Sequence, residues 1–537
     1  MSLRSLLRVG VLALATTAQA WEATIGEGNL DDGFDVVVDA AGDVVTAGGV
    51  AIGGQDFAVV KLDGLTGGEI WRYVASGSLG EPDYADQVAV DGSSDVFASG
   101  YIREPGTEAS VVKLDGTTGA EIWRRDLPDT LSPGTATWLV VTGSGDVVVA
   151  TGVSVRRLDG ASGADVWAAG TGSCLGGPLA IQAAGDVIAT HWRSQSLPDG
   201  EMCRRDAASG TIVWSTNLGD TSVLDVDLDG ADDVVIAGHF DNGLNWTAAK
   251  LDGATGGVAW RVDAGLNARV NAVAVDSSGD VIVGGLLAPS NTLLAKLDGT
   301  SGATLWQEGI SAVIDVAVDG NDDVITAEVS LGTIGLVRKV AGTDGSFLWR
   351  SHGGFPVDLD AAGQPVSLSD PLSRGWRVAK TGGPLTGRSF LVYDTTQSTK
   401  LVVKAKDSAV LYPLAGLSPG TFGATLEILN PTTLEGISMP LPAAGWVVSS
   451  NTATYSDKEG TFGPCSKVKL KREKLLRAVC KGIAFTLNEP MQGSLRATLE
   501  LAGDPRSRQC VEFGGTVTID APGTFKALDS PPPATCP

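Results

Sequence analysis

One short block of sequence recurs through most of the chain and limits its possible folds more than any other feature. The first copy, residues 61–71, reads KLDGLTGGEIW. Further copies end at later tryptophans, the last of them degenerate, and one tryptophan precedes the first copy, giving the set Trp21, Trp71, Trp123, Trp167, Trp214, Trp260, Trp306 and Trp349. Successive members are 50, 52, 44, 47, 46, 46 and 43 residues apart. This period is typical of solenoids, arrays and β-propellers.

Each repeat contains the pieces of a four-stranded antiparallel blade. In the second repeat, an inner strand near residues 88–91 is followed by strands near 95–98 and 110–114, and a fourth strand carries Trp123. These Val-, Ile- and Ala-rich stretches are too short for helices. Asp and Gly fill the turns, because Gly permits positive φ and a carboxylate accepts backbone N–H bonds.

Counting the strands predicts eight blades. Eight inner strands and eight third strands can be placed between residues 21 and 386, but the last repeat ends at Lys380 without a tryptophan of its own. We therefore predict an all-β, eight-bladed propeller of four-stranded antiparallel blades, whose last blade is completed by residues 21–25 at the mature N-terminus. Closing the ring in this way would remove exposed sheet edges. The alternative is that residues 389–392 complete that blade.

The recurring block resembles the tryptophan-docking motif of pyrroloquinoline-quinone-type propellers, Ala-x-Asp-x-x-Thr-Gly-x-x-x-Trp. Asp63, Thr66, Gly67 and Trp71 match that motif, and the resemblance covers roughly residues 21–386. In that family the tryptophan packs between neighbouring blades, so the resemblance implies a structural girdle of eight tryptophans. An eight-bladed lipoprotein of outer-membrane barrel assembly is similar in architecture.

The resemblance also bears on catalysis. In the dehydrogenases of the family it would imply a quinone centre, a bound calcium and a catalytic aspartate. This chain has no adjacent cysteine pair and no segment to which those site residues transfer, so we assign no catalytic residue. Each third strand also ends in Lys or Arg where the motif has Ala. One hypothesis places this cation over a tryptophan of the adjacent blade; the alternative is a solvated cation beside the acidic turns.

Composition and charge set the domain organisation and exclude some partners. The formal net charge of −24 argues against nucleic acid or an anionic membrane as the main partner. Residues 1–20 have a cationic start, an apolar run and a small-x-small end, which predicts a signal peptide. No cysteine follows at Trp21, so we expect no lipid anchor, and no later run is long enough to span a membrane. The predicted location is secreted or periplasmic.

The repeat stops near residue 387, where the charge balance changes sign. Residues 387–537 hold 16 Lys or Arg and 13 Asp or Glu, whereas the rest of the chain has a net charge of −27. Short strand-like stretches in this part predict a C-terminal β-sandwich with a Pro-rich tail. The predicted domains are therefore 1–20, 21–386 and 387–537. Residues 467–474 are cationic enough to indicate an anionic partner, although an exposed hairpin explains them as well.

The cysteines fit an oxidising compartment. We expect Cys174 to pair with Cys203 across the long segment 191–200. In the C-terminal part, pairing of Cys465 with Cys480 and of Cys510 with Cys536 is preferred among three possible arrangements.

Candidate ligand sites follow from which face of a propeller the loops occupy. The first-to-second and third-to-fourth strand turns lie on one face, here called the turn face, and they are monotonous. The other connections lie on the opposite face, here called the loop face, and vary in length and chemistry, which is typical of a binding surface. Two matching loop entries on that face carry aromatic pairs that could line a ligand patch, although local packing explains them as well: His191, Trp192, His239 and Phe240.

A second candidate is a partial calcium loop. It lies in the densest carboxylate group of the chain, which includes Asp225, Asp227, Asp229 and Asp233. The loop lacks the terminal Glu of a complete calcium loop, and the segment matches only in part. We therefore expect no cofactor, with calcium as the one alternative. The function predicted from sequence is a non-enzymatic scaffold that binds a protein or polysaccharide through its loop face. The alternative is a quinone-dependent dehydrogenase or another propeller-centred enzyme.

Overall fold

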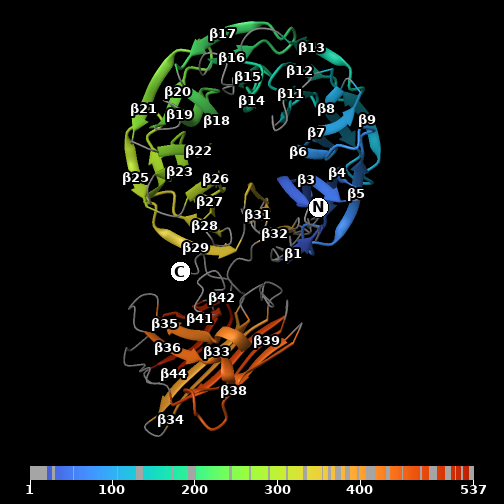
Figure 1. Cartoon of the computed structure of the whole chain (residues 1–537). Coiled ribbons are helices and arrows are strands. Elements are labelled where there is room, and N and C mark those ends of the chain that lie inside the picture. The colour runs from blue at the N-terminus through green and yellow to red at the C-terminus, as the bar shows by residue number, and fades with distance from the viewer. Residues whose placement is uncertain are drawn as a thin grey trace, which may run out of the picture.

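The computed structural model of the chain shows a ring of blades and a second β-rich unit outside that ring (Figure 1). The structure describes residues 21–537 apart from 27–30, 52–53, 106, 129–136, 171–173, 191–200, 220, 241–244, 265–267, 288–290, 310–311, 330–335, 353–354, 361–363, 369–376, 381–386, 396–397, 407–417, 431–435, 450–451, 472–473, 483–492, 502–508, 515, 522–523 and 531–537. The predicted signal peptide lies outside the described residues. Within them, no helix is long and apolar enough to cross a membrane.

The ring consists of eight four-stranded antiparallel sheets, as the repeat count predicts. From the channel to the rim, the strands of blades 1 to 4 are β2 (Asp32–Val38), β3 (Val44–Ala51), β4 (Gln55–Leu62) and β5 (Glu69–Ala75); β6 (Tyr84–Val90), β7 (Val96–Glu104), β8 (Thr107–Leu114) and β9 (Glu121–Asp126); β10 (Trp138–Val141), β11 (Val147–Ala150), β12 (Val155–Leu158) and β13 (Asp165–Ala169); β14 (Leu179–Ile181), β15 (Val187–Thr190), β16 (Glu201–Arg205) and β17 (Ile212–Asn217).

Blades 5 to 8 follow the same order. Their strands are β18 (Thr221–Leu228), β19 (Val234–Phe240), β20 (Asn245–Leu251) and β21 (Val258–Ala264); β22 (Ala268–Val275), β23 (Val281–Leu287), β24 (Asn291–Leu297) and β25 (Thr304–Glu308); β26 (Ala312–Val318), β27 (Val324–Val329), β28 (Leu336–Val340) and β29 (Phe347–His352); β30 (Val357–Leu359), β31 (Pro365–Leu368), β32 (Arg377–Lys380) and β1 (Trp21–Thr24).

The ring is closed by the first described strand. β1 pairs antiparallel with β32, with Trp21 opposite Lys380, so the predicted closure by the N-terminal strand is confirmed. The alternative closure is wrong, because residues 389–392 belong to β33 in the second unit. The seam also has contacts between blades 8 and 1, where Asp358 accepts the N–H of Val38 at 2.7 Å. Blade 8 is thus tied to blade 1 at the rim and at the channel.

The tryptophans hold neighbouring blades together. Seven of them, Trp21 to Trp306, donate from the indole Nε1 to a backbone carbonyl in the turn of the next blade, at 3.0–3.1 Å. The side chain of Trp349 lies outside the described residues. Each indole also lies against a turn glycine of the next blade: Gly256 has φ +74°, and a Cβ there would lie 2.6 Å from Cδ2 of Trp214. The turn therefore requires glycine both for its conformation and for this contact.

The cation of each third strand is placed differently from either sequence hypothesis. Lys61 is only 5% exposed, and its Nζ lies 2.7 Å from Asp39 and 3.6 Å from Asp43, two carboxylates of the inner turn. It also donates to the carbonyl of Gly116 in the next blade. The one cation–π contact found for this row of cations among the described residues is Lys113 over Phe97 of its own blade. The cation is therefore a buried ion-pair partner rather than a tryptophan ligand or a solvated side chain.

Blades 3 and 4 vary this arrangement in a consistent way. There the first turn carboxylate is replaced by Thr142 or Gln182, and the cation is Arg157 or Arg204 instead of Lys. Arg204 donates to Asp186 through Nε at 2.8 Å, and its Nη2 lies 2.6 Å from the same carboxylate. One carboxylate thus suffices where the cation is a planar guanidinium with several donors.

The second unit is a β-sandwich, as predicted. Its larger sheet has the order β37-β38-β39-β40-β34-β33-β44-β43 and its smaller sheet the order β36-β35-β41-β42. Residues of both sheets share one core. The elements are β33 (Gly387–Thr395), β34 (Ser398–Ala405), α1 (Pro419–Phe422), β35 (Ala424–Leu429), β36 (Gly436–Leu441), η1 (Ala443–Gly445), β37 (Trp446–Ser449), β38 (Thr452–Ser456), β39 (Cys465–Lys471), β40 (Leu475–Lys481), β41 (Leu495–Leu501), β42 (Gln509–Phe513), β43 (Thr516–Ala521) and β44 (Thr524–Ser530).

Two of the expected disulfides are present. Cys174 bonds to Cys203 in blade 4, and Cys465 bonds to Cys480 between the neighbouring strands β39 and β40. Cys510 is buried, but Cys536 lies outside the described residues, so that pairing stays a prediction.

Candidate binding site at the mouth of the central channel

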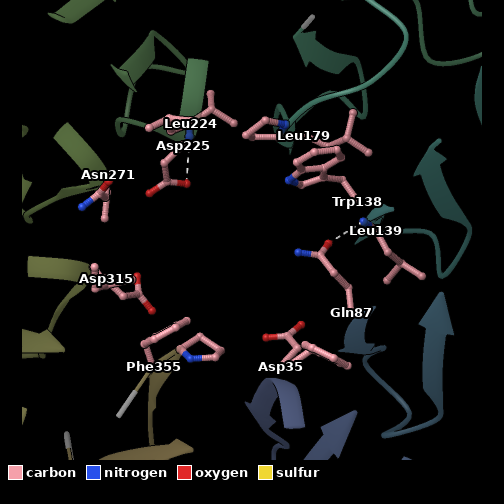
Figure 2. A pocket seen from close by; sticks show the side chains of 16 residues that line it. Asp35, Gln87, Trp138, Leu139, Leu179, Leu224, Asp225, Asn271, Asp315 and Phe355 are labelled. Atoms are coloured by element: carbon pink, nitrogen blue, oxygen red, sulfur yellow. Dashed lines mark hydrogen bonds between the residues drawn. The ribbon is translucent and has the colours of Figure 1, made fainter. Parts of the chain in front are cut away.

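A pocket of about 370 Å³ lies where the inner strands of the ring converge. Figure 2 shows side chains from blade after blade pointing toward this central space. The lining draws on every blade, with residues Phe34, Asp35, Gln87, Trp138, Leu139, Pro178, Leu179, Leu224, Asp225, Val226, Asn271, Ala272, Ile314, Asp315, Phe355 and Pro356. These residues lie between the position just before an inner strand and the middle of that strand, on the loop-face side of the turns. We call this pocket the channel mouth.

β-bulges help to aim side chains at the channel mouth. In five inner strands the register shifts near the start, as between Gly33 and Asp35 in β2 and between Val313 and Asp315 in β26. A bulge bends the strand and re-aims the side chains beside it. Phe34 and Ile314 occupy the extra positions and line the pocket.

Three carboxyl groups line the mouth and also connect neighbouring blades. Asp35 accepts the N–H of Val36 at 2.8 Å and that of Val88, in the next blade, at 2.9 Å. Asp225 and Asp315 make the same pair of bonds, to Val226 and Val273 and to Val316 and Val357. Both oxygens of each carboxylate therefore already accept a backbone N–H. The three aspartates therefore connect neighbouring blades, and they would interact with a ligand through their charge.

Burial dominates the electrostatics of these groups. Loss of contact with water raises the pKa of Asp35 to about 7, of Asp225 to about 8 and of Asp315 to about 6, against the lowering effect of their N–H donors. Repulsion among the channel carboxylates adds to the increase. The same cause raises the pKa of Asp86 to about 7. The mouth thus changes its charge near neutral pH.

Apolar and amide groups complete the mouth. Phe34 is 42% and Phe355 is 37% exposed, and both line the same pocket. Gln87 accepts the N–H of Leu139, and Asn271 donates to the carbonyl of Val313, so both amides also join neighbouring blades. No lysine or arginine stands among the described lining residues. The site therefore combines exposed aromatic rings with carboxyl groups whose negative charge depends on pH.

The quinone implied by the docking motif does not fit this site. Pyrroloquinoline quinone is a polycarboxylate, so its site needs cations or free donors, whereas the described lining presents three carboxyl groups. The N–H groups nearest to them are already used by those carboxyl groups. We therefore derive no redox step at the channel mouth.

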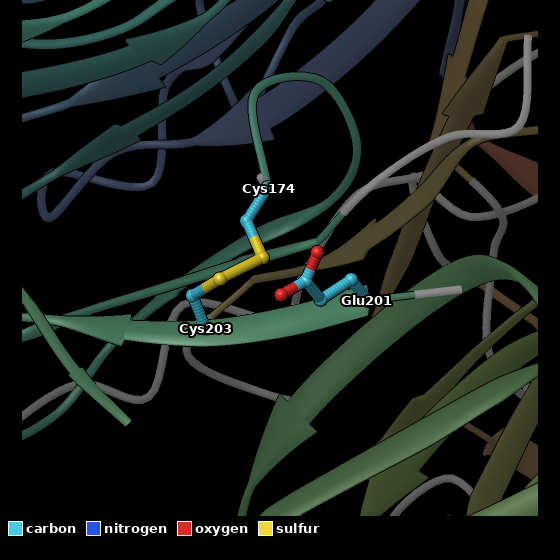
Figure 3. Close-up of side chains that lie close together, drawn as sticks. All are labelled: Cys174, Glu201 and Cys203. Atoms are coloured by element: carbon cyan, nitrogen blue, oxygen red, sulfur yellow. A yellow bond between two sulfur atoms is a disulfide. The ribbon is translucent and has the colours of Figure 1, made fainter. Parts of the chain in front are cut away.

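The residues proposed for calcium are not gathered into one site. Asp225 and Asp227 accept N–H groups of Val273 and Val275 in the next blade, while Asp229 and Asp233 both lie beside Nζ of Lys250. Among the described residues, the one cluster of three potential metal-ligating side chains is Cys174, Glu201 and Cys203 (Figure 3). Its two sulfur atoms are joined in the disulfide and cannot act as thiolate ligands. Calcium binding stays a prediction that calorimetry can test.

The predicted aromatic patch is described only in part. His191 and Trp192 lie outside the described residues. His239 and Phe240 end β19, paired with Ser222 and Thr221 at the loop-face end of β18, but their side chains lie outside the described residues.

Sequence reasoning missed the channel mouth itself. The available signal was an Asp four residues before the turn Asp, in blades 1, 5 and 7.

Comparison with known proteins places the propeller in a family. The family model described as "Outer membrane protein assembly factor BamB" matches residues 55–244 and 152–329, which together span just over half of the chain. The chain belongs to this BamB family. No curated protein matches the sequence.

Solved structures agree on the fold. BamB from Moraxella catarrhalis is 17% identical, with a TM-score of 0.48, 67% of this chain covered and 96% of that one. The Dos1 propeller is 12% identical, with a TM-score of 0.51 and coverages of 68% and 96%. Sqt1 of Saccharomyces cerevisiae is 10% identical, with a TM-score of 0.51 and coverages of 68% and 98%. The latter two likenesses show a propeller fold alone.

Proposed function

We propose that this BamB-family chain is an exported, non-enzymatic scaffold that binds a partner protein on its loop face, with a basic and apolar segment of that partner seated in the channel mouth. The observation that carries the proposal is the convergence of all eight blades on one pocket with exposed phenylalanines and carboxyl groups. The family description, an assembly factor, supports a protein as the partner. The disulfides support an oxidising compartment.

The chemistry of the mouth defines the segment that would fit. A Lys or Arg side chain entering the pocket would favour the ionised forms of Asp35, Asp225 and Asp315 and so lower their pKa values. Phe34 and Phe355 would lose water-exposed apolar area against the aliphatic part of the segment, which is the usual source of binding energy at an interface.

The test is affinity capture from the native cell envelope with the full chain immobilised, followed by binding measurements with the purified partner. A Phe34→Ser/Phe355→Ser variant should lose the partner. The matched control is Leu65→Ser, which removes an apolar side chain that is 49% exposed in a turn-face turn of blade 1 and should retain it. Retention of the partner by the double variant would contradict the proposal, and so would a polysaccharide that the wild-type chain captures and the double variant does not.

The enzymatic alternative has its own test. The full chain is incubated with pyrroloquinoline quinone and calcium and assayed for dye reduction with alcohols and sugars as substrates. We expect no activity above that of free quinone, because the described lining of the mouth presents three carboxyl groups and no lysine or arginine to the quinone's carboxylates. Substrate-dependent dye reduction would replace the scaffold proposal with a dehydrogenase.

A further inference from the structure

The larger sheet of the sandwich carries an unusual concentration of positive charge. Its neighbouring strands β39, β40 and β34 contain no Asp or Glu. They hold seven cations, namely Lys400, Lys404, Lys467, Lys469, Lys471, Arg477 and Lys481. The alternating burial in these strands places Leu401, Val468 and Ala478 in the core. Because side chains alternate between the two faces of a sheet, the seven cations lie together on its outer face.

Three of these cations are direct neighbours. The strand register places Lys469 of β39 opposite Arg477 of β40, and Arg477 opposite Lys404 of β34. Side chains directly opposite each other on neighbouring strands are about 5 Å apart at Cβ, and like charges in such pairs destabilise a sheet. Within the described part of the chain, none of the three forms an ion pair with a carboxylate. The fold therefore keeps a row of unneutralised like charges at a cost in stability.

Hydroxyl groups border the cationic row. The next strand, β38, places Thr454 opposite Lys469, and its two other outward residues are Thr452 and Ser456. Half-buried Val402 and Val479 lie between the cations on β34 and β40. The outward positions of these four strands carry no aromatic side chain. The outward positions of β38, β39, β40 and β34 thus offer positive charges and hydroxyls without an aromatic side chain among them.

We infer that this face binds an acidic polysaccharide. A linear chain of sugars with carboxylate or sulfate groups presents repeated negative charges for the row Lys404, Arg477 and Lys469, and it presents hydroxyls for β38. Single-stranded nucleic acid is disfavoured because its binding depends on aromatic stacking. An extended anionic surface, such as a membrane or a long duplex, is also repelled by the net negative charge of residues 1–386. A flexible polysaccharide can contact the sandwich alone.

The experiment measures binding of the full, disulfide-intact chain to polygalacturonate, with neutral dextran, duplex DNA and phosphatidylglycerol vesicles as comparison probes. We expect binding to polygalacturonate that weakens steeply with added salt, and no binding to dextran. The variant Lys404→Gln/Lys469→Gln/Arg477→Gln should bind roughly a hundredfold more weakly, since each cation near an anionic surface contributes several-fold. The charge-conserving control Lys404→Arg/Lys469→Arg/Arg477→Lys should bind like wild type.

Folding is checked in the same preparations. Because the neutral variant loses like-charge repulsion, its melting temperature should be equal to or higher than that of wild type. If the triple variant does not fold, the single variant Arg477→Gln replaces it, with an expected severalfold loss. The Phe34→Ser/Phe355→Ser variant should bind polygalacturonate normally, which separates this site from the channel mouth.

Three results would overturn the inference: no binding to polygalacturonate at low salt, equal binding by the neutral variant, or tighter binding to DNA or vesicles than to polygalacturonate.

Discussion

Aspartate serves two ends of the central channel in different ways. At the turn face, Asp229 lies 2.6 Å from Nζ of Lys250; burial alone would raise its pKa, but the hydrogen bond and charge of the lysine hold that pKa below its usual value. At the mouth, Asp225 of the same strand is held by backbone N–H groups, and burial raises its pKa to about 8. Asp225 in β18 and Asp229 in the turn directly after that strand are thus carboxylates of different kinds, four residues apart.

The two kinds of aspartate differ in whether their charge depends on pH near neutrality. The pKa of Lys250 is raised and that of Asp229 is lowered, so this pair keeps its charges through the neutral range, and Lys250 connects to the next blade by donating to the carbonyl of Gly299. The carboxyl groups of the mouth are ionised only when the pH exceeds their raised pKa values. Experiments can therefore address each end of the ring separately.

The largest effect is expected at the turn face. Lys296 lies 2.6 Å from Asp276 and 3.2 Å from Asp280 and is nearly buried. Lys296→Met should lower the free energy of unfolding by about 3 to 5 kcal/mol, because it leaves the buried carboxylate of Asp276 and the partly exposed one of Asp280 without their cation. Chemical denaturation at pH 7 measures this change. Lys296→Arg is the control and should lose much less, and an unchanged midpoint for Lys296→Met would show that the pair contributes nothing.

The next effect concerns the pH dependence of the whole chain. The folded-state pKa values of Asp35, Asp86, Asp225 and Asp315 lie above their unfolded values, so the folded state binds more protons. Their contribution to stability is complete below about pH 4 and is lost as the pH rises through the range from about 6 to 8. Between pH 5 and pH 9 the free energy of unfolding should fall by a few kcal/mol. A flat profile would mean that the channel carboxyl groups are well solvated.

A smaller effect distinguishes Asp225 in β18 from Asp229 in the turn that follows it. Asp225→Asn removes one titrating group, so the slope of stability against pH should decrease by roughly 1 to 3 kcal/mol over pH 5 to 9. At pH 5 it should cost about 1 kcal/mol, because the amide keeps one acceptor for two N–H groups. Asp229→Asn should leave that slope intact while lowering stability throughout. Thermal melts of both variants across this pH range measure the two slopes. An equal change in slope for Asp225→Asn and Asp229→Asn would contradict the prediction.

The smallest effect belongs to exposed turn carboxylates. Asp252 accepts the N–H and the hydroxyl of Thr255, and the hydroxyl bond holds its pKa below the usual value. Stability from this group is present above about pH 4 and lost as the pH falls through its lowered pKa. Asp252→Asn should therefore change the melting temperature slightly at pH 7 and reduce the acid-induced loss below pH 4. A shift as large as that of Lys296→Met would contradict its exposed position.

Sequence alone predicted the parts of the fold that depend on counting. The tryptophan period gives the number of blades, and the missing tryptophan after Lys380 points to Trp21 as the closing residue. Spacing also predicted the disulfides of blade 4 and of the β39–β40 pair. These features follow from repeat counts and residue spacings along the sequence.

Features that depend on register between elements were not predictable in the same way. The sequence predicts either a solvated side chain or a tryptophan contact for Lys61, because its actual neighbour, the inner turn at Asp39, lies two strands away. It predicts a calcium ligand at Asp225, because the bulge that directs this side chain toward the channel is invisible in the sequence. The row Lys404, Arg477 and Lys469 likewise depends on the order of strands in the sandwich.

The closing strand has a consequence for how the molecule is assembled. Lys380 and Trp21 both donate to the carbonyl of Gly64, which joins segments 316 residues apart in the first case and 43 in the second. The earliest part of the described chain to be synthesised must therefore wait, as an unfinished β-strand, until the last blade has been made. A contact of this sequence separation is slow to form. Deleting residues 21–25 should yield a chain that begins to fold normally but stalls as an open, aggregation-prone arc.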